Sequence, residues 1–395
     1  MMKTIAMTNP LVFNKKRLIG QSVAPCGFAF LAISVCLSAN GLQAKELNPD
    51  ISVVLDGMYI DNPLALGHGG PGFALGHNEL SLGAPIDDLF IGRLTTVIES
   101  HDGETELELE EAYLRTTGLG YGLNVKAGRF LSAIGYLNSQ HTHSDRFSTR
   151  PAVYRSLLGS HYFDDGLQLN LTLPTDLYWR VTAEALQGDA ISDVENGVGL
   201  YTLSTKLGGD LSASQSWQAG LSYMKNRSPA IQEEEHDHAD DEDEEHDHAG
   251  HSHGLSYYGG DLYAADLVWK WAPQGNNRQQ QVELSAEYFY VDELNDFADE
   301  DDFHEGWYVA AVWRFAPQWS TGVRYGEVDL RQPHGDHFHS QSLRESDVML
   351  SYSHSHFSTI RLQYTRQTGE GFSDIDSAIL LQYVMSFGEH GAHEF

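Results

Sequence analysis

Hydrophobic and polar residues alternate along most of the chain after residue 50, with the period of two that is typical of β-strands. In residues 167–173, four leucines alternate with glutamine, asparagine and threonine, and residues 282–290 and 379–387 follow the same order. Many of the positions on the polar face carry charge. One apolar and one polar face per segment predict strands that separate an apolar surrounding from water.

Segments of this kind recur through the chain and are joined alternately by tight turns, as at 316–318, and by long connections, as at 135–162. We place them at 51–60, 76–84, 88–100, 103–117, 120–133, 163–173, 176–188, 197–207, 214–227, 256–271, 278–292, 305–316, 317–330, 343–354, 356–368 and 374–387. The order predicts an all-β fold, a transmembrane antiparallel β-barrel of about 16 strands (range about 14–18), without a separate plug domain.

A soluble β-sandwich would alternate in the same way. Strands of ten or more residues, tyrosine and tryptophan near strand ends, and heavily charged polar faces favour the barrel instead. The segment 103–117 changes phase at Glu111, which we interpret as a β-bulge or a shift of register. A second long connection, 331–342, is expected to be a loop.

The first 44 residues have the order of a secretory signal peptide. Lys15, Lys16 and Arg17 precede a largely apolar run at 26–37, and cleavage is expected after Ala44. Residues 45–395 then form the barrel. All 56 acidic residues but only 20 of the 24 basic residues follow residue 44, so the mature net charge is −36 with histidine neutral. Such a charge excludes nucleic acid as a partner and concentrates cations near the surface.

Residues 233–253 contain eleven acidic residues and six histidines, with no apolar side chain larger than alanine. This composition predicts a disordered extracellular loop over 228–256. Imidazole and carboxylate together suit Zn²⁺, whereas an acidic insert that only keeps the surface hydrated would not need histidine. The candidate ligands are His236, Asp237, His238, His246, Asp247, His248, His251 and His253.

Two further histidine groups are candidate metal sites. His141 and His143 lie in the 135–162 connection, whose position resembles that of the inward-folded loop that narrows many porins. We expect this loop to line a cation-selective constriction, although ordinary polar surface explains two loop histidines equally well. The second group supplies three imidazoles and a carboxylate within six residues, namely His334, Asp336, His337 and His339.

Several stretches resemble a known family. LELEEAYLRTTGL, LNVKAGRFLSAIGYLNSQHTHSDRF and DDGLQLNLTLPT, all within 107–190, look like proteobacterial zinc-regulated outer-membrane receptors, and more distantly like phosphate-selective and general porins. The ending MSFGEHGAHEF is similar to the same family. The resemblance implies an outer-membrane barrel in a zinc-responsive setting. The terminal Phe395 resembles the signal by which such barrels meet their assembly machinery.

These features predict a porin-like channel, embedded in outer-membrane lipid of a Gram-negative bacterium, that captures divalent metal on its acidic loop and assists its passage. Zn²⁺ is the expected ligand or transported ion, with other divalent cations possible and no tightly bound cofactor. An energy-coupled receptor and a non-conducting surface metal-binding barrel are the alternatives, and homotrimers are possible. We expect no enzymatic activity, because Ser144 beside His143 lacks the context of a catalytic triad.

Deletion of residues 232–254 is expected to weaken zinc binding by the purified protein and to slow growth in zinc-limited medium. Imidazole must be neutral to bind metal, so capture should also weaken as pH falls through about 6.5. Equilibrium dialysis against zinc and growth curves measure the two effects. Unchanged binding together with unchanged growth would contradict this role for the loop.

Overall fold

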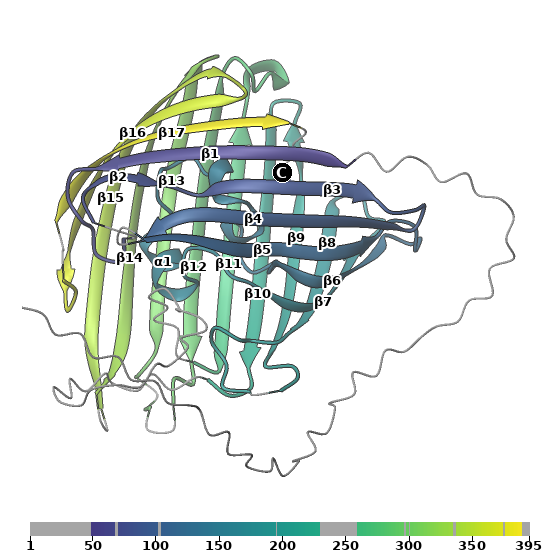
Figure 1. Ribbon diagram of the computed structural model, residues 1–395, viewed down its shortest axis with the longest axis horizontal. Coiled ribbons are helices and arrows are strands. Elements are labelled where there is room, and N and C mark those ends of the chain that lie inside the picture. Colours follow the sequence, from purple (N-terminus) through teal and green to yellow (C-terminus); the bar gives the residue numbers. More distant parts are fainter. Residues whose placement is uncertain are drawn as a thin grey trace, which may run out of the picture. The chain divides into compact units, whose positions relative to one another are not determined.

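The computed structural model describes residues 49–67, 70–101, 104–194, 196–229, 259–295, 298–299, 301–334, 337–373 and 376–388. Within these ranges one antiparallel sheet contains seventeen strands. The sheet closes on itself because β17 pairs with β1 over nine residue pairs, from Ser52 with Gly388 to Ile60 with Leu380. Figure 1 shows this junction, with the yellow β17 beside the purple β1.

The strands follow one another around the barrel in chain order. The first half consists of β1 Asp50–Ile60, β2 Gly72–Leu75, β3 Asn78–Pro85, β4 Phe90–His101, β5 Glu104–Thr116, β6 Leu123–Leu131, β7 Phe163–Thr172 and β8 Tyr178–Leu186. The second half consists of β9 Leu200–Ser212, β10 Gln215–Asn226, β11 Asp261–Trp271, β12 Gln281–Asp292, β13 His304–Ala316, β14 Trp319–His334, β15 His337–Ser355, β16 Ser358–Glu370 and β17 Ser377–Gly388.

The short strands β2 and β3 occupy one position in the barrel, since both pair with β1. The described barrel is therefore sixteen-stranded, as the sequence predicts. The expected phase change in 103–117 is also confirmed: Thr95 pairs with Glu111 and Thr96 with Leu109, which leaves Glu110 as the extra residue of a bulge.

Alternation along β16 shows how each strand meets two environments. Ile360, Leu362 and Tyr364 point outward and are 44–48% exposed, whereas Gln363 and Thr365 point into the barrel and are fully buried. An apolar outer surface with polar residues inside is the inverse of a soluble protein and matches a barrel in lipid. Among the described residues, no helix is long and apolar enough to cross a membrane.

The two ends of the barrel differ. At the short-turn end, strands are joined by tight connections such as 317–318 and 356–357. At the long-loop end lie the connections 132–162 and 187–199. Residues 230–258, which include the acidic stretch at 233–253, lie outside the described residues. Trp179, Trp313 and Trp319 face outward near the short-turn end, where an aromatic girdle is expected.

Three local features differ from expectation. The strand β2 was not predicted, because four residues are too few to show a period. The predicted loop 331–342 is wrong, since β14 and β15 continue to His334 and His337. The connection 135–162 contains two 3-10 turns and the helix α1 Ala152–Leu157, all six residues of which are buried. Six consecutive buried residues are too few to show the period of a helix in the sequence.

Residues 132–162, which we call the inward loop, lie inside the barrel. The loop is bonded to wall strands around the circumference: Ser132 Oγ donates to Glu184 of β8, Arg155 pairs with Glu345 of β15, and Ser148 N donates to Gln363 of β16. The helix α1 packs against β13, β14 and β15. The inward position that the sequence suggested is therefore confirmed.

Glu287 of β12 is a further anchor, which accepts four hydrogen bonds. Its carboxylate accepts hydrogen bonds from Tyr136 N at 2.6 Å, Tyr154 Oη at 2.7 Å and Tyr308 Oη at 2.7 Å. Gly135 has φ +66° and lets the backbone approach closely, because a Cβ there would lie 2.6 Å from Glu287 Oε2.

Apolar side chains of the inward loop also pack against the wall. Tyr154, Leu157 and Leu158 join a buried cluster with inward-facing residues of β9 to β15, including Phe289 and Tyr308. On this side an apolar core fills the half of the lumen nearer the long-loop end. A cavity of about 540 Å³ remains beside β9 to β14 nearer the short-turn end, and further cavities lie on the side of β1 to β8.

Replacement of Glu287 by alanine removes the acceptor of several buried donors at once. We expect a stability loss on the order of 3 kcal/mol and a larger single-channel conductance, because the inward loop is released from the wall. Thermal unfolding in detergent and planar-bilayer recordings measure these effects. The matched control is Asp266→Ala: Asp266 faces Glu287 on β11, and neither of its oxygens has a hydrogen-bond partner among the described residues. Equal effects of the two substitutions would contradict the anchoring role.

Candidate metal pathway in the lumen

Two bulges turn acidic and histidine side chains into the lumen. Between β2 and β3 the register against β1 shifts at Gly76 and His77, so that His77 and Glu79 both face inward and are buried. In β5 the bulge makes the consecutive residues Glu110 and Glu111 both face inward. Bulges commonly re-aim side chains at functional sites.

The inward loop brings its histidines onto these carboxylates. His141 Nδ1 lies 3.0 Å from Glu110 Oε2, and its Nε2 lies 3.4 Å from Glu111 Oε2. His143 Nδ1 lies 2.6 Å from Glu79 Oε1. The two sequence-predicted histidines thus meet three wall glutamates that are far from them along the chain.

His161, at the end of the inward loop, meets Glu110 from the other side. His161 Nε2 and His77 Nε2 each lie 3.4 Å from Glu110 Oε1. His77 Nε2 is also 3.5 Å from Glu79 Oε1. We call the whole group the lumen cluster: His77, Glu79, Glu110, Glu111, His141, His143 and His161.

The electrostatics of the loop histidines differ. Burial lowers the pKa of His141, but the negative charges of Glu110 and Glu79 outweigh it and hold that pKa well above its ordinary value. Burial dominates at His161 and lowers its pKa to about 4, so this imidazole is neutral at pH 7. Carboxylates held this close together out of water need compensating positive charge, which protonated histidine or a divalent cation can supply.

The lumen cluster separates two cavities. A cavity of about 810 Å³ towards the long-loop end is lined by His77 and His161, by six acids (Asp56, Glu99, Glu108, Asp145, Asp164 and Asp189) and by three arginines (Arg129, Arg150 and Arg155). A cavity of about 340 Å³ towards the short-turn end is lined by Glu79, Glu111, His141 and His143 together with Arg93, Arg115, Lys126 and Arg180. Glu110, only 1% exposed, contacts histidines of both cavities through its two oxygens. Side-chain charge therefore changes from largely acidic to largely basic across Glu110.

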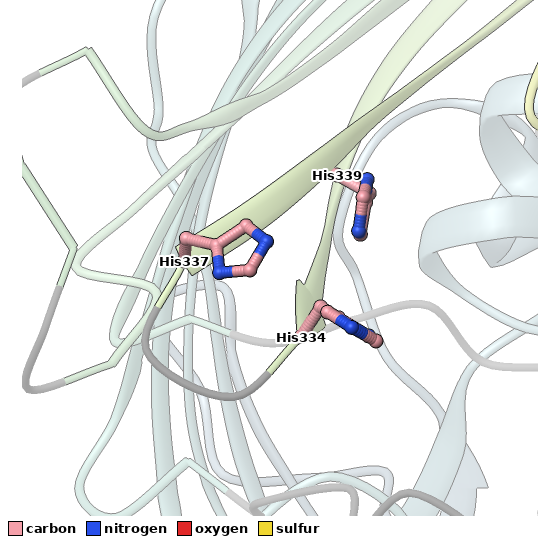
Figure 2. A group of neighbouring side chains, drawn as sticks. All are labelled: His334, His337 and His339. Atoms are coloured by element: carbon pink, nitrogen blue, oxygen red, sulfur yellow. The ribbon is translucent and has the colours of Figure 1, made fainter.

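A second histidine group lies exposed at the tip of the β14–β15 hairpin. His334 ends β14, while His337 and His339 begin β15, and Figure 2 shows the three imidazoles gathered around one space. One ring nitrogen from each lies within 4.8 Å of the others. Asp336 lies outside the described residues. Three neutral imidazoles at this spacing can hold a divalent metal.

The structure assembles part of the predicted ligand set and adds to it. His141 and His143 lie in the lumen cluster, and the three histidines at the hairpin tip come together. The candidates at 236–253 and the terminal Phe395 lie outside the described residues, so their roles stay predictions. Sequence reasoning missed His77, Glu79, Glu110, Glu111 and His161. Its nearest signal was the pair Glu110–Glu111 at the phase change.

Comparisons with known proteins bear on the fold. No protein-family model matches the chain. An uncharacterized protein of Aquifex aeolicus (strain VF5) is 29% identical over 402 residues, which cover 89% of this chain and 81% of that protein. Salmonella typhi OmpF, solved in complex with daunomycin, has a TM-score of 0.56 at 11% identity, with 86% of this chain and 97% of that chain covered.

Two further solved structures have a similar fold. A loop L8 deletion mutant of OmpT, an outer-membrane protein of Vibrio cholerae, has a TM-score of 0.55 at 8% identity and covers 86% of this chain and 99% of its own. OprB of Pseudomonas putida at high pH has a TM-score of 0.53 at 12% identity, covering 86% and 94%. At such identities the likeness shows the fold alone, and that fold is a porin-like barrel.

Proposed function

We propose that the protein is an outer-membrane channel that admits divalent cations, with zinc as the principal ion. The observation that carries this proposal is the lumen cluster, which places imidazole and carboxylate groups at the junction of two cavities inside the barrel. Nitrogen and oxygen ligands together suit Zn²⁺ better than Mg²⁺ or Ca²⁺, which prefer oxygen alone.

The proposed path of the ion runs through the two cavities on either side of the lumen cluster. Cations gather at the acidic cavity near the long-loop end, exchange through the lumen cluster, and leave through the smaller cavity near the short-turn end. The basic residues of that second cavity, such as Arg93 and Arg115, disfavour retention of a cation there. The hairpin-tip histidines and the loop at 228–256 would then raise the local zinc concentration at the entrance.

The porin-like fold supports an outer-membrane location, with the long-loop end outside the cell. A structure of Vibrio cholerae OmpT described as a trimer form, with a TM-score of 0.52 at 8% identity and coverage of 86% of this chain and 99% of that one, supports a homotrimer. The regulation by zinc that the sequence resemblance implies, the contact of Phe395 with assembly machinery, and the expectation of no enzymatic activity all stay predictions.

A second candidate function follows from the apolar core between the inward loop and β9 to β15. If that core keeps the lumen shut, the protein is a surface metal-binding barrel that does not conduct. An energy-coupled receptor is the third possibility, and dependence of zinc uptake on the inner-membrane energy system would favour it.

Planar-bilayer recordings with the purified protein separate conducting from non-conducting forms. We expect channels that prefer K⁺ over Cl⁻ and whose K⁺ current falls when zinc is added, because the bound ion occupies the path. The double substitution Glu79→Gln/Glu110→Gln should lower the preference for K⁺ by roughly half or more and abolish the block by zinc.

The matched control is Asp176→Asn, which removes a carboxylate from the exposed turn between β7 and β8. This variant should keep the selectivity and the zinc block of the unmodified protein. Absence of any conductance from correctly folded protein would overturn the channel proposal and leave the surface metal-binding barrel.

A further inference from the structure

Four polar atoms at the centre of the lumen cluster are buried without a hydrogen bond. Among the described residues, His77 Nε2, Glu110 Oε1 and both ring nitrogens of His161 find no partner. The side chains of His77, Glu110 and His161 are 8%, 1% and 9% exposed. Buried polar groups are almost always bonded, and three of these four atoms, all except His161 Nδ1, converge on one point, which calls for a ligand.

The spacing of these atoms identifies the kind of ligand. Each Nε2 lies 3.4 Å from Glu110 Oε1, beyond the usual 2.7–3.2 Å range of a hydrogen bond. Ligands 2.0–2.1 Å from a tetrahedral Zn²⁺ are separated from one another by about 3.4 Å. The three atoms also lie within 4.8 Å of one another, so a small rotation of either imidazole completes the arrangement.

The surroundings resemble those of a metal ligand shell. A carboxylate also stands beside the other nitrogen of His77: Nδ1 lies 3.7 Å from Glu99 Oε2, an ion-pair distance that is longer than a hydrogen bond. The other oxygen of Glu110, Oε2, lies 3.0 Å from His141 Nδ1. With Glu99 beside His77 Nδ1 and His141 beside Glu110 Oε2, the remaining atoms, His77 Nε2 and Glu110 Oε1, face each other and His161.

We propose that His77, Glu110 and His161 bind one Zn²⁺ tetrahedrally, with the fourth position open to the 810 Å³ cavity. This inference deepens the proposed function, on which it rests for the identity of the ion. A site with three protein ligands and one exchangeable position can accept zinc from that cavity. His141 Nδ1 lies 3.0 Å from Glu110 Oε2 and 3.6 Å from Glu79 Oε2, so these three residues offer the ion its next ligands towards the short-turn end.

Zinc binding tests the site in full-length barrels purified in detergent. Candidate ligands outside the lumen cluster are first removed by deletion of residues 232–254 and by His337→Ala and His339→Ala. Equilibrium dialysis against ZnCl₂ should then show one tightly bound zinc. Adding His77→Ala and His161→Ala should weaken it more than about 100-fold, because loss of a supporting partner alone costs roughly 10- to 100-fold. His356→Asn, a histidine in the exposed turn between β15 and β16, should leave it bound.

Zinc K-edge X-ray absorption is measured on the background protein, which lacks residues 232–254, His337 and His339 but keeps His77 and His161. This measurement does not depend on whether the His77→Ala and His161→Ala substitutions disturb folding. The expected spectrum is four-coordinate, with nitrogen and oxygen ligands and two imidazoles. Folded background protein that binds no zinc, or equal loss in the His356→Asn variant, would overturn the site. Cation-selective conductance without bound zinc would overturn this zinc site but not the channel proposal. Bound zinc in a barrel that does not conduct would support the site and overturn the channel proposal.

Discussion

Hydrogen bonding between wall carboxylates and the inward loop determines what the inside of this barrel can do. A sixteen-stranded barrel is wide enough to hold an aqueous lumen. Glu184, Glu287 and Glu345 hold the loop against three different parts of the wall. The loop also buries an apolar core against β9 to β15 at the long-loop end, and two of the cavities that remain lie on the side of β1 to β8. The histidines of the loop then meet the glutamates of that side, and the lumen cluster results.

The fold was largely predictable because each strand meets lipid on one face and the lumen on the other. Ile360, Leu362 and Tyr364 show the period as clearly in the sequence as in the structure. The bulge in β5 was predictable for the same reason, since an extra residue reverses the phase of the alternation. The division of one barrel position between β2 and β3 was not predictable, because Gly72–Leu75 is too short to show an alternating pattern.

The site was only partly predictable, and the reason is geometric. The metal-binding potential of His141 and His143 could be proposed from their spacing within a long loop. Their partners depend on barrel closure and on two bulges: Glu79 is 64 residues away from His143, and Glu110 is 31 residues away from His141. His77 and His161 are single histidines with no neighbouring histidine in the sequence. A local pattern carries no information about contacts of that kind, although two adjacent glutamates at a phase change are a signal worth following.

We propose that zinc crosses this barrel by exchange through the lumen cluster and needs no energy source. The most direct measurement is zinc entry into sealed liposomes that contain the purified protein and an internal fluorescent zinc indicator. The account predicts entry that saturates with external zinc, proceeds without a membrane potential or nucleotide, and is lost in the Glu79→Gln/Glu110→Gln variant. Entry that fails to occur in liposomes with correctly folded protein, or that is unchanged in that variant, would contradict it.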